Sequence, residues 1–268
     1  MKKNILTCLS LFALMAGLVS CDKTEGTIYT PQDDKISFSA VSTNLTIEQG
    51  NVALPVSRSF TSGELSVPLS LSAAGEGYED VFSLAGPVTF ADGQASALAN
   101  ISVGDISTID PSALSVTATG NDISVGLAFP FTVAIDSANA SLSNLTSINV
   151  LASNTLTFGD SQTAELNSEE GWSESETPHV VEVQKAEGAN VYKVVSPFGA
   201  NSFAFMIKSD GETIVCPNQI IDNHPDYGPV TMGGVTGSIE GNVVTLNVGG
   251  YSVSAGSFGG GKEVITLP

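Results

Sequence analysis

Basic residues are scarce in this sequence, and their scarcity limits the partners that the chain can have. It holds nine Lys and Arg against 28 Asp and Glu in 268 residues, a formal net charge of −19. A surface of this charge repels the phosphates of nucleic acids and anionic lipid headgroups. We therefore expect no nucleic-acid partner.

Cysteine and histidine are also rare, and this removes several kinds of site. Cys8 and Cys21 lie near the N-terminus, so Cys216 alone remains for the rest of the chain and cannot form an internal disulfide. Cys216 lies in a strand-like run without a cationic neighbour in sequence, which predicts a buried, inert thiol. The only histidines, His179 and His224, are far apart. No catalytic motif built on serine, cysteine or histidine occurs, so we expect no cofactor and no enzymatic activity.

Long apolar runs are absent except at the N-terminus. Two lysines at positions 2 and 3 precede an apolar run over residues 5–17, which is too short to span a bilayer permanently. Residues 18–21 (Leu-Val-Ser-Cys) then match a lipobox, in which the cysteine is acylated before cleavage. This pattern predicts a lipoprotein signal peptide over residues 1–20 and lipid attachment at Cys21.

Removal of residues 1–20 takes away two lysines and no acid, which leaves seven basic against 28 acidic residues, or −21. Residues 21–35 are polar and without periodicity, as is typical of a flexible tether. We expect the lipid on Cys21 to hold the protein at the outer membrane or the cell surface. A position on the periplasmic face of the outer membrane is the alternative.

From residue 35 onward, apolar and polar residues alternate with a period of two. Residues 65–71 and 131–135 alternate in this way, and turn residues such as 91–93 (Ala-Asp-Gly) separate the runs. A period of two places one face of a strand on a core and the other in solvent. No stretch combines helical spacing with caps, so the predicted fold class is all-β.

Two β-sandwich-like modules are expected, because a break near residues 152–154 follows a strand-like run. It divides the folded part into residues 36–152, which have the length of an immunoglobulin-like sandwich, and residues 153–268. Pro55 and Pro68 lack the amide donor of a ladder, so their strands are predicted to be edges or to carry bulges.

Several pieces of the first module match a known family. They are residues 36–39, 45–50, 54–58, 88–94 and 99–103, and the strand followed by Asp92-Gly93 is the most specific. These pieces resemble the Calx-β-like sandwiches. The resemblance implies a sandwich and a calcium site at one end, for which Glu48 matches the family's early acid.

The residues argue against that calcium site. Asp80, Asp92 and Asp105 are scattered singly, and residues 126–131 are apolar where the family has its late acids. A full shell for Ca²⁺ takes six or more oxygens. We therefore expect no metal site in this module.

The second module has its own matching pieces, which are residues 156–160, 191–198, 237–242 and 251–259. They resemble the C-terminal β-module of many Bacteroidetes surface lipoproteins. The resemblance implies a cell-envelope protein linked to glycan capture or adhesion.

Two segments of the second module have the composition of a ligand site. Asp222, His224, Asp226 and Tyr227 form one loop of carboxylates, an imidazole and an aromatic ring, although a plain solvated turn has the same composition. Trp172, the only tryptophan, stands among polar residues. It is either a platform for a sugar ring or a cap folded onto the core, which is the commoner fate of a large apolar ring.

The leading hypothesis is a non-enzymatic envelope lipoprotein that binds a polysaccharide or serves a glycan-capture assembly. One alternative is a structural or adhesive protein whose partner is a neighbouring envelope protein, through an unpaired edge strand or an apolar patch. A second is a glycan hydrolase or its accessory, which needs facing carboxylates in a cleft.

Overall fold

The computed structural model describes residues 35–120, 122–136, 141–142, 145–173 and 178–268. The predicted signal peptide (1–20), Cys21 and all but the last residue of the predicted tether lie outside these residues. The predicted all-β fold is confirmed, because only α2 (Tyr78–Val81) and η1 (Ile106–Thr108) are helical among the described residues. None of the described helices has the length and apolar character needed to cross a bilayer.

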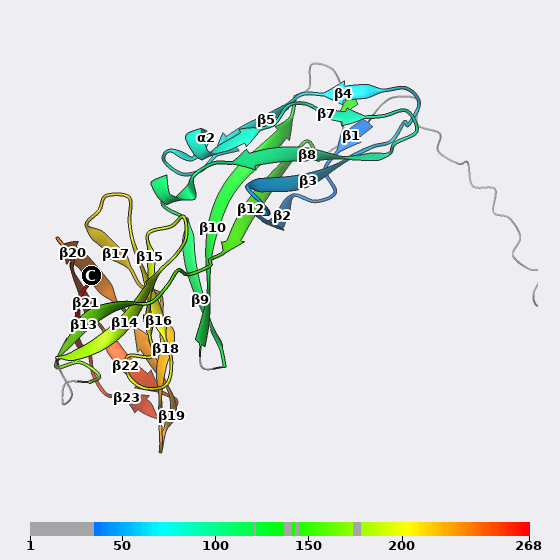
Figure 1. Cartoon of the computed structure of the whole chain (residues 1–268). Helices are drawn as coiled ribbons and strands as arrows, with labels where there is room; N and C mark the ends of the chain where they lie inside the picture. The colour runs from blue at the N-terminus through cyan, green and yellow to red at the C-terminus, as the bar shows by residue number, and fades with distance from the viewer. Residues whose placement is uncertain (1–34, 121, 137–140, 143–144, 174–177) are drawn as a thin grey trace, which may run out of the picture. The chain divides into compact units, whose positions relative to one another are not determined.

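Twelve strands make up the first half of the folded chain (Figure 1). They are β1 (Lys35–Ser37), β2 (Ser42–Thr46), β3 (Asn51–Arg58), β4 (Leu65–Val67), β5 (Leu69–Ala73), β6 (Phe82–Leu84), β7 (Val88–Phe90), β8 (Ser96–Val103), β9 (Ala113–Thr119), β10 (Asp122–Ile135), β11 (Ser141–Leu142) and β12 (Ser147–Thr155).

These strands form two large sheets and a small one. One sheet has the order β11-β1-β3-β8-β6, the second has the order β2-β12-β10-β5 with β9 also paired to β10, and β4 pairs with β7. Most pairs are antiparallel, but β1 runs parallel to β11 and β2 runs parallel to β12. The early strands thus complete sheets with strands from the end of the same half.

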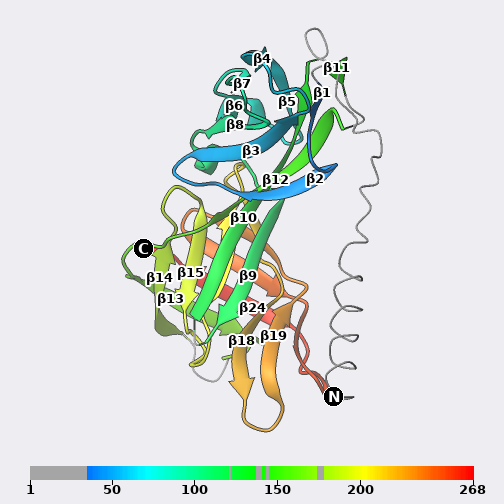
Figure 2. The same cartoon turned by 90° about the vertical axis from the view of Figure 1, so that its right-hand side faces the viewer.

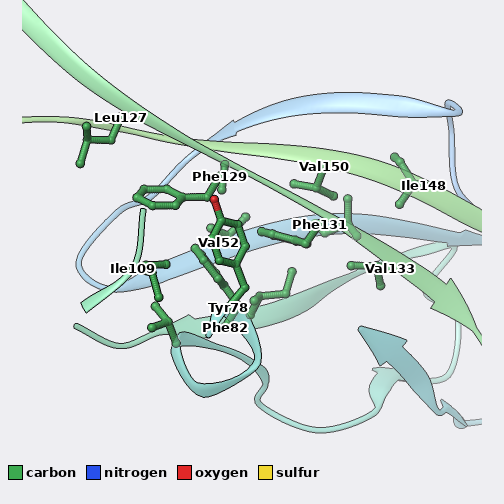
Figure 3. Close-up of a cluster of buried hydrophobic side chains, with 14 of the residues drawn as sticks. Val52, Tyr78, Phe82, Ile109, Leu127, Phe129, Phe131, Val133, Ile148 and Val150 are labelled. Carbon is green, nitrogen blue, oxygen red and sulfur yellow. The ribbon is translucent and has the colours of Figure 1, made fainter. Parts of the chain in front are cut away.

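The alternation in β10 explains the core of this half. Every second residue from Ile123 to Ile135 is buried, which gives the strand one continuous inward face. Phe129 and Phe131 of that face meet Phe82 with ring centroids 5.6 Å and 5.2 Å apart. Figure 3 shows these rings with Tyr78, whose centroid lies 5.8 Å from that of Phe129. The core is built from aromatic and aliphatic side chains.

Twelve further strands follow. They are β13 (Gln162–Glu169), β14 (His179–Lys185), β15 (Val191–Val195), β16 (Phe203–Ile207), β17 (Thr213–Val215), β18 (Gln219–His224), β19 (Gly228–Gly233), β20 (Thr236–Glu240), β21 (Val243–Val248), β22 (Gly250–Val253), β23 (Gly256–Ser257) and β24 (Gly261–Thr266).

Eight of these strands close into a barrel of antiparallel neighbours, in the order β13-β14-β15-β16-β17-β20-β21-β24, and β24 closes it by pairing with both β13 and β21. The other four form a sheet in the order β18-β19-β22-β23. Figure 2 shows β18 and β19 as a hairpin. The closed barrel is more specific than the sandwich-like module expected from the sequence, because alternation alone does not say whether a sheet closes.

The two halves share contacts. The apolar cluster of the first half continues into Ala186, Ala189, Val191, Ala204 and Met206 of the second. No ladder among the described strands joins β1–β12 to β13–β24. The boundary at 152–153 remains a prediction.

Candidate functional site

The predicted site segment lies in the hairpin between β18 and β19. Asp222 and His224 belong to the end of β18, whereas Asp226 and Tyr227 lie in the turn. The backbone N–H of Asp226 donates to Nδ1 of His224 at 3.1 Å. Gly228 then begins β19 with φ of 74°, a left-handed conformation that glycine adopts at little cost. The plain turn that the sequence offered as the alternative is therefore present, but only over residues 225–227.

Four rings meet beside this hairpin, and we name Trp172, His224, Tyr227 and Phe258 the aromatic ledge. The ring centroid of Phe258 lies 5.3 Å from that of Trp172, 5.5 Å from that of His224 and 5.9 Å from that of Tyr227. His224 and Tyr227 are themselves 4.8 Å apart. Tyr227 is 47% exposed and Phe258 is 48% exposed. The ledge thus offers apolar ring surface to solvent.

Trp172 combines the two fates considered from the sequence. It is partly buried, and its ring packs on Tyr251 with centroids 5.5 Å apart as well as on Phe258. Its Nε1–H donates to Oδ2 of Asp222 at 2.8 Å, while Oδ1 of Asp222 accepts from the backbone N–H of Asn223 at 2.8 Å. The indole is therefore fixed in orientation by one carboxylate of the predicted site.

A fully buried carboxylate lies beneath the ledge. Glu263 accepts hydrogen bonds from the backbone N–H of Trp172 at 2.8 Å, from the hydroxyl of Tyr251 at 2.6 Å and from the hydroxyl of Ser168, which also lies 2.9 Å from that of Ser173. Desolvation by burial raises the pKa of Glu263. Burial, followed by the charge of Glu263, raises the pKa of Tyr251. Glu263 therefore couples the barrel interior to Trp172.

A surface hollow of about 200 Å³ adjoins the exposed rings. It is lined by Tyr227, Val253, Ala255, Gly256, Ser257 and Phe258. The backbone around it is fixed, because Phe258 N–H donates to Tyr251 O at 2.9 Å and Tyr251 N–H donates to Gly259 O at 2.7 Å. Asp226 is exposed in the neighbouring turn. The arrangement offers apolar faces and a carboxylate to a ligand on the surface.

Trp172, Asp222, His224 and Tyr227 are thus brought together, although Trp172 is 50 residues from Asp222. Sequence reasoning missed Phe258 and Glu263. Glu263 did carry a signal, because it stands two residues from Ile265 in β24 and so falls on the same inward face. An aromatic residue in a glycine-rich turn, as Phe258 is, is a weaker signal.

Two other residues discussed from the sequence have hydrogen-bond partners or burial of their own. His179 begins β14, and its Nε2 lies 3.2 Å from the carbonyl oxygen of Pro197. The predicted burial of Cys216 is confirmed. Burial raises the pKa of its thiol to about 12, which keeps it in the unreactive protonated form.

The acids considered for calcium have local roles in the first half. Asp105 caps η1 by accepting from the N–H of Ser107 at 2.9 Å, and Asp92 accepts from the N–H of Gly63 at 2.6 Å. Glu48 opens a backbone turn closed by Asn51. Within the described ranges, no three His, Cys, Asp or Glu residues gather as a metal site would require. The expectation that calcium does not bind remains a prediction.

No protein-family model and no curated protein matches this chain. Solved structures give distant likenesses. A Bacteroides ovatus protein of unknown function is 8% identical with a TM-score of 0.36, over 87% of this chain and 95% of its own. CBD12 from CALX1.2 is 10% identical with a TM-score of 0.34, over 84% of this chain and 83% of its own.

An auxiliary nutrient binding protein from Bacteroides thetaiotaomicron is also similar, at 10% identity and a TM-score of 0.32, over 85% of this chain and 89% of its own. The neighbours thus include a Calx-β structure and Bacteroides proteins, as the sequence resemblances do. TM-scores this low carry no argument about function, so function has to be inferred from the residues of the chain itself.

Proposed function

We propose that this protein binds a glycan at the aromatic ledge. The observation that carries the proposal is the pair of half-exposed rings, Tyr227 and Phe258, beside a hollow and an exposed carboxylate. A pyranose ring has an apolar C–H face that packs on an aromatic ring and hydroxyl groups that donate to carboxylates. The ledge offers both chemistries in one place.

The fixed geometry of the ledge favours binding. Trp172 is held by hydrogen bonds to Asp222 and Glu263, and the backbone N–H of Phe258 donates to the carbonyl oxygen of Tyr251. Rings that are already ordered lose little conformational entropy when a ligand arrives. A weak, shallow contact can therefore still give measurable affinity for a polymer.

The test is a binding screen of the purified protein against soluble polysaccharides, read by the fluorescence of Trp172, the only tryptophan. Phe258→Ala should raise Kd at least about tenfold, which corresponds to about 1.4 kcal/mol. Phe60→Ala is the matched control, because Phe60 is also exposed (39%) but lies in the first half of the chain. Equal affinities for the two variants would contradict the proposed site.

Binding without cleavage is part of this proposal. Both carboxylate oxygens of Asp222 already accept hydrogen bonds, and Nδ1 of His224 accepts one from Asp226. Groups engaged in this way hold the rings in position, which supports a role in binding. Incubation with a bound polysaccharide should release no new reducing ends, and their appearance would favour the hydrolase alternative.

We further propose that the protein is lipid-anchored through Cys21 at the cell envelope. The charged start, the short apolar run and the lipobox support this location. Cys21→Ser should abolish palmitate labelling and leave the precursor uncleaved. Normal labelling of that variant would refute the anchor and leave the ledge untouched.

A further inference from the structure

Two carboxylates lie beside the aromatic ledge. Asp222 accepts the indole N–H of Trp172, and Asp226 is exposed in the turn next to Tyr227. The backbone N–H of Asp226 donates to Nδ1 of His224. The described charges at the rings are therefore those of Asp222 and Asp226.

Each lysine of the second half contacts a residue that is not part of the aromatic ledge. Lys262 pairs with Glu169 at 2.6 Å, Lys193 with Asp122 at 3.2 Å and Lys208 with Asp110 at 3.6 Å. Lys185 lies over the ring of Tyr192, 5.6 Å from its centroid. These four lysines are the only Lys or Arg residues after position 155.

Arg58 is the one arginine of the chain, and it is committed to the first half. It is buried, and its guanidinium donates to the carbonyl oxygens of Thr61, Gly63, Ala91 and Gln94. None of these five cationic side chains forms an ion pair with a residue of the ledge in the part of the chain that the structure describes.

We propose that the ledge selects neutral glycan chains and rejects chains of uronic acids or sulfated sugars. This inference rests on the proposed function and names the class of glycan. An anionic sugar stacked on Tyr227 and Phe258 comes close to Asp222 and Asp226, and none of the five cationic side chains described above pairs with the ledge to compensate it. The net charge of −19 adds a repulsive field that slows the approach of a polyanion.

The experiment compares one polymer with its own charged derivative. The purified protein is first screened against neutral polymers (mixed-linkage β-glucan, xyloglucan, galactomannan and amylose) and anionic ones (polygalacturonate, alginate and chondroitin sulfate). The neutral polymer that binds best is then oxidised at its primary hydroxyls to carboxylates, which adds charge and keeps every linkage. We expect at least tenfold weaker binding of the oxidised polymer.

Salt and a charge-reversal variant separate repulsion from lost hydroxyl contacts. At about 1 M salt the Debye length is about 3 Å, so most of the lost affinity for the oxidised polymer should return. Asp226→Lys should strengthen binding of the oxidised polymer at low salt at least fivefold. Glu64→Lys is the matched control, because it changes net charge equally at an exposed position of the first half, and it should have a smaller effect.

The outcomes are distinguishable. Equal or tighter binding of the oxidised polymer, or tight binding of polygalacturonate, overturns the charge selection and leaves glycan binding standing. An equal response of the Asp226→Lys and Glu64→Lys variants assigns the repulsion to net charge and overturns the role of the ledge carboxylates. Absence of binding to every polymer overturns the proposed function and this inference together.

Discussion

The cores of the two halves differ in kind. The first half buries aromatic and aliphatic side chains, and its one buried charged residue is Arg58, which ties loops together through carbonyl oxygens. Of the seven buried polar or charged residues among those described, the other six lie after Thr155, Glu263 included. A buried carboxylate is expensive unless several donors satisfy it.

This difference separates a scaffold from a site. In the first half, alternation and ring packing are enough to explain the buried apolar residues. In the barrel, Glu263 receives three donors, and one of them is the backbone of Trp172 in the ledge. The buried carboxylate of Glu263 thus lies next to the aromatic ledge. Mutation of Glu263 tests whether it supports the ring of Trp172.

The largest expected effect comes from the apolar core. Phe129→Ala removes a fully buried ring that contacts both Tyr78 and Phe82, and should lower the free energy of unfolding by about 3–5 kcal/mol. Urea unfolding measures it. Leu98→Ala, at a side chain that is 54% exposed, is the control and should cost below about 0.5 kcal/mol. A loss below 1 kcal/mol for Phe129→Ala would mean that the core is not packed as described.

The polar core should give a smaller loss with a second readout. Glu263→Ala removes the acceptor of the Tyr251 hydroxyl and of the Trp172 N–H, and one partner of the Ser168 hydroxyl, at a cost of about 2–4 kcal/mol. The emission of Trp172 should shift because its backbone anchor is gone. Glu263→Gln keeps an acceptor and should lose less than half as much. Unchanged emission of Trp172 in the Ala variant would contradict the role of Glu263 in supporting this residue.

The comparison of the wild type with Glu263→Gln also predicts how stability depends on pH. Burial raises the pKa of Glu263 above its usual 4.5 in the folded protein. The stabilisation that comes from protonating Glu263 is therefore complete below the pKa of the unfolded state, and it is lost as the pH rises through the pKa of the folded state. Glu263→Gln removes this titration. The stability of the wild type relative to the Gln variant should therefore fall from pH 4 upward. Urea midpoints of both proteins between pH 4 and 8 measure it, and parallel curves would contradict it.

The smallest effect is expected where the two halves touch through charge. Asp122→Asn removes the ion pair with Lys193, whose amine also lies 5.1 Å above the ring of Phe158. Asp122 is exposed, so solvent screens the pair and the loss should stay below about 1 kcal/mol. Thermal unfolding measures it, and a loss of 3 kcal/mol would show that the pair holds the halves together.

Strands were predictable from the sequence, but their partners were not. The alternation of residues 131–135 predicted the inward side chains of β10, and the structure confirms their burial. Pro55 suggested an edge strand, yet β3 lies between β1 and β8. Because β1 pairs only with Ser57 and Arg58, the side of β3 away from β8 has no described ladder partner over residues 51–56, so the strand is an edge at Pro55 as predicted. Periodicity carries no information about which strand lies alongside or whether a barrel closes.

The candidate site was predictable in part for the same reason. Composition singled out Trp172 and the segment from Asp222 to Tyr227, because polar loops that contain aromatic rings are typical of ligand sites. Their meeting depends on tertiary structure. Phe258 comes from a third segment, and Glu263 from a strand whose other inward positions are apolar. A charged residue in phase with buried apolar neighbours, as Glu263 is with Ile265, is the sequence signal of a polar group in the core.

The long-range pairing of strands has a consequence for how the chain acquires its structure. Leu45 of β2 accepts a hydrogen bond from Ser153, 108 residues later, and Glu169 of β13 meets Lys262, 93 residues later. Neither half can close its sheets until these distant strands exist, and topologies of this kind fold slowly. At a synthesis rate of about 5–20 residues per second, β13 waits about 5–20 seconds for β24. During that interval the nascent barrel is an open chain, which is the state that chaperones hold and translocation channels accept.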